Sequence, residues 1–475
     1  MTTEQQPGTT EPQPTVFILY GGTGDLAKRM VLPAFYELFL RGLLPDKFRL
    51  IGNGRGDVSH EDFQGRIRES LTEFADEPKP DDWDAFSPNV RFAGGGFRDD
   101  NPGSLLDVIA EAKEDLGEEV DVIHYLAIPP NNFDATTKAI KAHDLAKGAK
   151  VVYEKPYGTS PESFTELDTL VHTVFDEEQV YRIDHFLGKE AVQNLHMLRY
   201  ANDIFADTWN RDHITEVQID VPENLDIADR AGFYDATGAA LDMLVTHLFQ
   251  VAAEVAMEPP TSFDAEAIQV ARESVIAAFR PLSPREVVLG QYASYRETEG
   301  IPEDSTTDTF VAARLWIDTD RWQGVPFLLR TGKKMATKAQ RVSLIYKRPA
   351  GPVSTTQNHP GVLSFDLSGT GSISLEMTVK KPGPDFVPAD ASNVLHLNSV
   401  SEGSMQPYTA LIHDVFAGDR SLFTSAPGLR AAFAAFSPLL GDQRPAVRPY
   451  DDDSWGPDAA DMLPGQFGWL LNSRA

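Results

Sequence analysis

Short apolar runs and longer amphipathic stretches alternate along the first 184 residues of the chain. The apolar runs have the length of buried strands, and they occupy residues 15–20, 48–51, 122–128 and 150–153. Between the first two runs, apolar residues from Leu26 to Phe39 recur at helical spacing. Pro33 is predicted to kink this helix because it lacks a backbone donor. The alternation predicts a Rossmann-like, doubly wound parallel sheet over residues 15–184.

The second half of the chain has a different pattern, in which apolar and polar residues alternate. This period of two predicts an antiparallel sheet with one covered face, with strands at residues 215–221, 309–317, 341–347, 362–367 and 372–379. Helices near residues 237–256, 407–418 and 426–439 are expected to cover that face. We therefore predict a larger α+β domain over residues 185–475. Residues 1–14, rich in Thr, Gln and Pro, are predicted to form a disordered tail.

Composition and charge narrow the possible classes of function. The absence of Cys excludes disulfides, thiolate metal sites and Cys nucleophiles, and it fits a reducing cytoplasm. The 42 basic and 71 acidic residues give a formal net charge of −29, which disfavours nucleic acid and anionic membranes as partners. No uninterrupted run of about 18 apolar residues occurs, and the N-terminal segment lacks the layout of a signal peptide. We therefore expect a cytoplasmic protein without a transmembrane helix.

A glycine-rich loop follows the first predicted strand and opens the next helix. Its sequence is Gly21-Gly22-Thr23-Gly24-Asp25-Leu26. Glycines let backbone N–H groups approach a pyrophosphate, and a helix N-terminus favours negative charge. No Gly-Lys-Ser/Thr follows, which excludes a nucleotide-triphosphate P-loop. The pattern is shorter than the usual fingerprint, but its position after the first strand predicts a dinucleotide site.

The end of the second predicted strand bears on the choice between NAD and NADP. A carboxylate there bonds the ribose hydroxyls of NAD, whereas an arginine accommodates the 2′-phosphate of NADP. In this chain the strand is followed by Arg55, and the nearest acid is Asp57. We predict a preference for NADP. The alternative is that Arg55 is a solvated loop residue.

Residues 182–190 place an acid, an imidazole and a lysine around a glycine. Asp184 suits the orientation of a catalytic base, and His185 with Lys189 suits the binding of a phosphate. The alternative is an ordinary salt-bridged loop, because charged clusters are usually solvated.

Two other segments carry basic residues in this acidic chain. The first, Glu154-Lys155-Pro156-Tyr157-Gly158, closes a predicted strand, where ligands bind in such folds. A cis bond before Pro156 is expected to aim Lys155. The second segment is Arg330-Thr331-Gly332-Lys333-Lys334, with Lys338 nearby. We expect this second segment to bind a phosphate group. The alternative is that it forms a solvated turn.

An amphipathic helix is predicted from Thr237 to Met257, and Asp242 and His247 interrupt its apolar stripe. On an α-helix five residues correspond to about 500°, so the two side chains stand about 140° apart and need not share a face. A His at the edge of an apolar stripe is more often a core residue than a catalyst, and both interpretations stay open here.

In this order, the motifs resemble those of the glucose-6-phosphate dehydrogenase family. The resemblance runs from about Val16 to Leu463, and it includes Trp209-Asn210-Arg211-Asp212, residues 324–333 and Gly418-Asp419-Arg420-Ser421-Leu422-Phe423. It implies an NADP-dependent enzyme that oxidises D-glucose 6-phosphate at C1 to 6-phospho-D-glucono-1,5-lactone, the first step of the oxidative pentose phosphate pathway. It also implies a homodimer or homotetramer, with residues 185–475 as the domain for substrate binding and oligomerisation.

The resemblance further implies roles for individual residues. His247 is expected to take the proton from the C1 hydroxyl while hydride leaves C1, and Asp184 to pair with His247. His185 and Lys189 are expected to hold the 6-phosphate. The sugar hydroxyls or the phosphate are expected to contact Lys155, Glu223, Asp242, Lys333 and Lys338. The cofactor is expected to bind at Gly21, Gly22, Thr23, Gly24, Asp25, Leu26, Arg55, Pro129 and Lys155. No metal site is expected.

The chain departs from the family pattern at several pocket positions. Met30 stands where a basic residue is usual, Phe186 where a tyrosine is usual, and Ser368 near the usual place of a glutamine. Arginine and asparagine are common where Leu241 and Thr246 stand. Losing one good hydrogen bond to a charged group costs about 1.5–3 kcal/mol. Two alternatives therefore remain: a dehydrogenase of another phosphosugar, and a non-catalytic nucleotide-binding paralogue.

Overall fold

The computed structural model describes residues 13–117, 119–227, 230–350, 360–400 and 403–472. All but two residues of the predicted tail lie outside these ranges. The chain divides into two compact units. The first comprises the described part of Met1–Gly158 together with Glu162–His185 and Gln406–Thr424, and the second comprises Thr159–Pro161 and the described parts of Phe186–Met405 and Ser425–Ala475.

The first unit is built on a seven-stranded sheet with the order β15-β6-β5-β4-β1-β2-β3. Its strands are β1 (Thr15–Tyr20), β2 (Phe48–Asn53), β3 (Val90–Ala93), β4 (Asp121–Leu126), β5 (Lys150–Tyr153), β6 (Val180–Ile183) and β15 (Phe423–Thr424). The first six pair in parallel. The apolar runs predicted four of these strands, β1, β2, β4 and β5, and did not predict β3 or β6. Strand β1 lies between β2 and β4, so the strand order reverses there, and ligands bind beside such a point in open α/β sheets.

Helices pack against this sheet and bury its apolar side chains. They are α1 (Leu32–Leu40), α2 (His60–Phe74), α3 (Pro80–Phe86), α4 (Leu105–Leu116), α5 (Phe133–Ala142), α6 (Pro161–His172) and α12 (Pro407–Ala417). The helix that contains Pro33 is irregular directly before this residue, because the π-helix η1 (Ala27–Val31) continues into α1 without a break. The predicted kink at Pro33 stays a prediction.

The segment Gln406–Thr424 belongs to the first unit, although the sequence analysis placed it in the C-terminal domain. Helix α12 was expected to cover the second sheet. Instead it buries Tyr408, Leu411 and Val415 in the same apolar cluster as Phe17 of β1. Strand β15 then pairs antiparallel with β6 and extends the first sheet. Burial of this apolar face decides the placement, because helical periodicity shows which face is apolar and not which sheet it meets.

The second unit contains a nine-stranded sheet with the order β14-β13-β12-β11-β7-β10-β9-β8-β16. Its strands are β7 (Ile214–Pro222), β8 (Val287–Tyr292), β9 (Phe310–Leu315), β10 (Phe327–Gly332), β11 (Arg341–Tyr346), β12 (Val362–Asp366), β13 (Ser372–Lys380), β14 (Pro388–His396) and β16 (Val447–Tyr450). Most neighbours are antiparallel, as predicted, but β7 pairs in parallel with β10, and β8 with β16.

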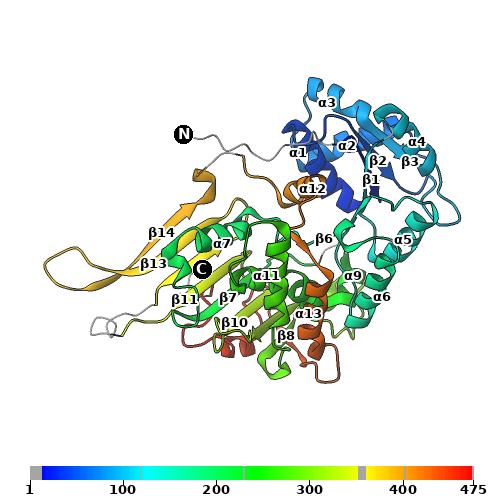
Figure 1. Cartoon of the computed structure of the whole chain (residues 1–475). Helices are drawn as coiled ribbons and strands as arrows, with labels where there is room; N and C mark the ends of the chain where they lie inside the picture. The colour runs from blue at the N-terminus through cyan, green and yellow to red at the C-terminus, as the bar shows by residue number, and fades with distance from the viewer. Residues whose placement is uncertain (1–12, 118, 228–229, 351–359, 401–402, 473–475) are drawn as a thin grey trace, which may run out of the picture. The chain divides into compact units, whose positions relative to one another are not determined.

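Helices of the second unit lie over one part of this sheet, where Figure 1 shows α11 and α13 in front of β7, β8 and β10. They are α7 (Glu190–Tyr200), α8 (Asp203–Ala206), α9 (Ala231–Ala240), α10 (Phe249–Ala256), α11 (Ala265–Ala277) and α13 (Ala426–Phe436), and the π-helix η6 (Leu241–Leu248) joins α9 to α10. The stretch Ala231–Ala256 is long and apolar enough to cross a membrane by length and composition alone. However, 89% of its most apolar window is buried inside the protein, as in a core helix.

Candidate functional site

A cleft of about 1070 Å³ opens in the first unit at the carboxyl ends of β1, β2 and β4. Its lining includes Gly21, Thr23, Gly24, Arg55 and Pro129, which are five of the residues predicted to bind the cofactor. Four others that were predicted do not line it: Gly22, Asp25, Leu26 and Lys155. The structure thus brings the glycine loop and Arg55 to one cavity, at the reversal of strand order where a dinucleotide is expected.

The glycine loop needs two of its glycines for close backbone approach. Gly21 has a φ of +75°, and a Cβ there would lie 2.3 Å from the carbonyl oxygen of Ala127. Gly22 is buried beneath the loop, where a Cβ would lie 3.0 Å from the Cα of Gly52. Gly22 therefore serves the packing of the loop on β2, which explains why it does not line the cleft.

A second glycine loop, which the sequence analysis missed, forms another wall of the cleft. Gly95 and Gly96 follow β3 and both have positive φ. The N–H of Gly96 donates to the carbonyl oxygen of Gly54 at 2.9 Å, so the loops after β2 and β3 are bonded together around Arg55. The signal was available, because three consecutive glycines, Gly94-Gly95-Gly96, follow the short stretch Val90-Arg91-Phe92-Ala93. Arg98, Asp99 and Asp100 also line this part of the cleft.

Lys155 follows β5 in the first unit, and the predicted cis bond to Pro156 is confirmed. The preceding residue, Glu154, is buried and accepts hydrogen bonds from the hydroxyls of Tyr125 at 2.6 Å and Tyr408 at 3.3 Å. Burial raises the pKa of Glu154 to about 7, although these tyrosine hydrogen bonds oppose the shift. Nothing in the sequence pointed to Tyr408, because it comes from α12 and is more than 250 residues away.

The segment after β6 carries the predicted Asp184 and His185. Asp184 is buried directly after the end of the strand, and the hydroxyl of Tyr157 donates to the carbonyl oxygen of Ile183. Tyr157 therefore ties the Lys155 segment to the start of the segment with Asp184. The predicted contact between Asp184 and His247 joins the two units and stays a prediction.

In the second unit, Asp242 and His247 both lie in the π-helix η6. The backbone N–H of Phe249 donates to the carbonyl oxygen of Leu244, the i→i+5 pattern of a π-helix. Residues five apart are then about one turn apart. The value of 140° derived for an α-helix is therefore wrong for this pair, and Asp242 and His247 lie on nearly the same face. Such π-helical turns often occur at functional sites.

The imidazole of His247 is buried under the ring of Phe186, with ring centroids 4.7 Å apart and planes 28° apart. On the same aromatic ring, the Nζ of Lys189 lies 4.9 Å from the centroid. This Nζ also donates to the Oε1 of Gln340 at 2.5 Å and to the carbonyl oxygen of Leu367 at 3.2 Å. Sequence reasoning missed Gln340. Leu367 directly precedes Ser368, so Gln340 supplies an amide oxygen close to the place where the resemblance implies a glutamine.

Three more predicted substrate residues gather around Tyr234 of α9. Lys333 forms an ion pair with Glu223, and its Nζ lies 5.8 Å from the centroid of the Tyr234 ring. Burial raises the pKa of Tyr234 well above its usual range, and the charges of Asp242 and Glu223 contribute to the shift. Lys338, in contrast, is exposed. The second unit therefore holds Lys189, Glu223, Asp242, His247 and Lys333 close to two aromatic rings that the motifs did not identify as contacts.

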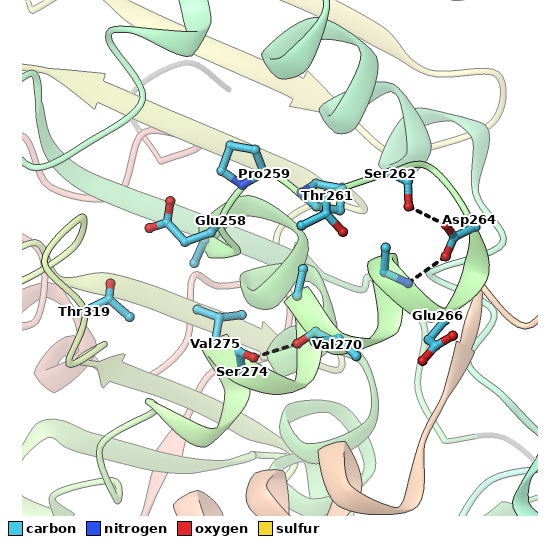
Figure 2. A pocket seen from close by; sticks show the side chains of 14 residues that line it. Glu258, Pro259, Thr261, Ser262, Asp264, Glu266, Val270, Ser274, Val275 and Thr319 are labelled. Atoms are coloured by element: carbon cyan, nitrogen blue, oxygen red, sulfur yellow. Dashed lines mark hydrogen bonds between the residues drawn. The ribbon is translucent and has the colours of Figure 1, made fainter.

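Another cleft of the second unit, of about 540 Å³, contains none of the predicted site residues (Figure 2). Two of its polar side chains are engaged in the structure of α11. The side chain of Asp264 accepts from the N–H of Ala267 at 2.9 Å, and the hydroxyl of Ser274 donates to the carbonyl oxygen of Val270 at 2.7 Å (Figure 2). This cleft is not the predicted site.

Comparison with known proteins decides the family. A family model described as glucose-6-phosphate dehydrogenase, NAD binding domain, matches residues 18–194, and a model of the C-terminal domain of the same enzyme matches residues 196–469. The chain belongs to the glucose-6-phosphate dehydrogenase family. This confirms the predicted resemblance and supports a nicotinamide dinucleotide as the cofactor.

Relatives of this family cover almost the whole chain. Glucose-6-phosphate 1-dehydrogenase 2 of Mycobacterium tuberculosis is 35% identical over 473 residues, which cover 94% of this chain and 92% of the relative. The enzyme of Leuconostoc mesenteroides is 32% identical over 479 residues, with 94% and 96% covered.

Solved structures of the family agree with the fold. Glucose-6-phosphate 1-dehydrogenase from Mycobacterium avium matches with a TM-score of 0.86 and 32% identity over 97% of this chain and 98% of that one. A family structure described as in complex with its substrate glucose-6-phosphate matches with a TM-score of 0.89 and 28% identity, over 98% and 99%. The predicted fold class, a Rossmann-like domain followed by an α+β domain, is confirmed.

Proposed function

We propose that this chain oxidises D-glucose 6-phosphate at C1 to 6-phospho-D-glucono-1,5-lactone with NADP as the hydride acceptor, the first step of the oxidative pentose phosphate pathway. The observation that carries the proposal is the π-helix η6, which puts the predicted base His247 on one face with Asp242. Membership of the family and the match to a relative described as bound to glucose-6-phosphate support the same substrate.

In this proposal His247 acts as the general base. Its imidazole takes the proton of the C1 hydroxyl, and the stacked ring of Phe186 fixes the plane of the imidazole. Asp184 pairs with His247, which fixes the tautomer and stabilises the imidazolium that forms. His185 and Lys189 hold the 6-phosphate. The sugar hydroxyls or the phosphate are bound by Lys155, Glu223, Asp242, Lys333 and Lys338.

The cofactor fits the cleft of the first unit. Gly21 lines this cleft with a backbone conformation that glycine favours, because a Cβ there would clash with the carbonyl oxygen of Ala127, and the loop leads into a helix whose first N–H groups favour a phosphate. The proposed cofactor residues remain Gly21, Gly22, Thr23, Gly24, Asp25, Leu26, Arg55, Pro129 and Lys155. When bound, the nicotinamide accepts the hydride from C1. Arg55 supports the choice of NADP, because it lines the cleft after β2 and Asp57 does not.

One observation favours a second candidate, a dehydrogenase of another phosphosugar. The ring of Phe186 occupies the place of the usual tyrosine, so no hydroxyl is available there for the substrate. A steady-state assay that follows the appearance of reduced cofactor, with a panel of sugar phosphates and with NADP or NAD, separates the candidates. The highest kcat/KM is expected for glucose 6-phosphate with NADP. A higher value for a different phosphosugar contradicts the substrate, and no turnover with any of them supports the non-catalytic paralogue.

We further propose a cytoplasmic homodimer or homotetramer. Strand β14 is an edge of the nine-stranded sheet, and its Val394 and Leu395 are 47% and 48% exposed. An exposed, apolar edge strand is a surface that another chain can cover. A relative from Arabidopsis thaliana, 34% identical over 95% of this chain and 91% of its own length, is named as cytoplasmic, which supports the compartment.

A further inference from the structure

A cleft of about 710 Å³ in the second unit concentrates positive charge in an otherwise acidic chain. It lies at the carboxyl end of β8 and beside the first residues of the paired strand β16 and the segment before it, and Arg296, Arg444 and Arg448 line it. Among the described residues of its lining there is no Asp or Glu. With a net charge of −29 on the whole chain, three guanidinium groups in one cleft make a local site for an anion.

The three arginines of the cleft differ in their exposure and in the side chains that they contact. Arg448 is exposed on β16, and Arg296 is exposed beside β8 with its Nε donating to the Oε1 of Gln291 at 3.0 Å. The amide of Gln291 is anchored in turn, because its Nε2 donates to the carbonyl oxygen of Thr307 at 2.9 Å. Arg444 is partly exposed and forms an ion pair with Asp308, whose side chain is only 2% exposed. The cleft therefore has two outward-facing cations and one that reaches into the core.

Asp308 connects the cleft to the helix that carries His247. Its Oδ2 accepts a hydrogen bond from the N–H of Ala240 at 2.6 Å, and its carbonyl oxygen accepts one from the N–H of Ala239 at 2.8 Å. Ala240 is the residue directly before η6. Gly238 has a φ of +71°, and a Cβ there would lie 2.7 Å from the Oδ1 of Asp308. The absence of a Cβ at Gly238 thus leaves room for the carboxylate of Asp308 beside the residues that precede η6.

We propose that the arginine cleft binds a polyanion of the di- or triphosphate class, and that Arg444 and Asp308 couple its occupancy to the start of helix η6. One guanidinium group can donate two parallel hydrogen bonds to the oxygens of a phosphate. Three guanidinium groups therefore match two linked phosphoryl groups better than they match a single phosphate. An anion that attracts Arg444 weakens the ion pair between Arg444 and Asp308. The hydrogen bond from the N–H of Ala240 to Asp308 then changes. An effect of this change on catalysis depends on the proposed role of His247, which lies in η6. Binding of the anion to the arginine cleft does not depend on that role.

Binding is tested by titrating the full-length protein with inorganic pyrophosphate in a calorimeter at constant ionic strength, in the presence of glucose 6-phosphate. We expect saturable binding with a Kd below about 1 mM, which corresponds to about −4 kcal/mol. The double variant R296A/R448A is expected to weaken binding at least tenfold. The control R285A removes an exposed charge at the opposite end of β8 and is expected to bind as the wild type does.

The coupling is tested by hydrogen exchange, which needs no catalytic activity. Pyrophosphate is expected to change the exchange rate of peptides that cover residues 238–248 in the wild type and not in Asp308→Asn, whose amide oxygen still accepts from Ala240. Absence of saturable binding, or equal binding by R296A/R448A with an unchanged melting temperature, overturns the site. Binding without any change in the exchange of this segment overturns the coupling. Arg448→Gln gives a second test of the site, since it keeps a polar side chain on β16.

Discussion

The ring of Phe186 stacks on the imidazole of His247, with centroids 4.7 Å apart. The partner of the proposed base is therefore an aromatic ring without a hydroxyl group, at a position where the resemblance implies a tyrosine. The ring also lies under the Nζ of Lys189 at 4.9 Å. One side chain thus contacts both a proposed base and a proposed phosphate ligand.

Phe186→Tyr is expected to strengthen substrate binding. The added hydroxyl offers a hydrogen bond to the anionic substrate, and such a bond to a charged group is worth about 1.5–3 kcal/mol, or about tenfold or more in affinity. We expect KM for glucose 6-phosphate to fall about tenfold with little change in kcat. The control Phe186→Leu removes the stacked ring and is expected to lower kcat. An unchanged KM in Phe186→Tyr contradicts a contact between this position and the substrate.

His247→Asn is expected to lower kcat by on the order of 10²–10⁴, because it removes the general base. Binding of glucose 6-phosphate, measured by calorimetry without cofactor, should change much less. His213→Asn, which changes a histidine outside the π-helix, serves as the matched control. A turnover near that of the wild type removes His247 from the role of base.

Arg55→Ala is expected to lower the preference for NADP over NAD. The loss of a charge-assisted hydrogen bond to the 2′-phosphate should reduce kcat/KM for NADP about tenfold or more and leave that for NAD nearly unchanged. Arg66→Ala removes one exposed positive charge from α2, outside the cleft, and controls for net charge. If both variants keep the ratio of the wild type, the assignment of Arg55 is wrong.

Glu154→Gln is expected to change how stability depends on pH. The pKa of Glu154 is about 7 in the folded protein and about 4.5 when unfolded, so the folded state binds the extra proton between these values. The free energy of unfolding should therefore fall as pH rises from about 4.5 to about 7, by about 3 kcal/mol from this group alone.

This contribution is absent from the neutral glutamine. Urea unfolding at pH 5 and pH 8 should show a smaller loss of stability with rising pH for Glu154→Gln than for the wild type. Glu166→Gln, an exposed residue of α6, should behave as the wild type does. Equal slopes for the wild type and Glu154→Gln mean that Glu154 titrates near its ordinary value.

Val394→Lys is expected to weaken the proposed dimer. The change places a charge on the exposed edge strand β14, and charges on an edge strand oppose pairing with another chain. Light scattering at several concentrations should show twice the chain mass of 52.3 kDa, or four times that mass, for the wild type and a lower average for the variant. Val270→Lys on α11, where the valine is 55% exposed, is the control. A wild type of single-chain mass contradicts the assembly.

The sequence by itself determined the character of both sheets and the membership of the family. Uninterrupted apolar runs predicted parallel strands that are buried on both faces, and β1 and β5 have the bounds that the runs indicated. Period-two alternation similarly predicted β7, β9, β11, β12 and β13 to within about two residues. These features are local, because the alternation of side chains along a strand reports which faces are covered.

Only the tertiary structure decided how distant segments combine. Helix α12 joins the first unit because its apolar face is buried with β1, more than 380 residues away in the sequence. The face shared by Asp242 and His247 depends on a π-helix, and helical periodicity calculated for an α-helix placed them apart. Tyr234, Gln340 and Asp308 carry no motif, because they contribute through contacts across the fold. Hydrogen bonds and burial between distant residues set these features, and no local pattern encodes them.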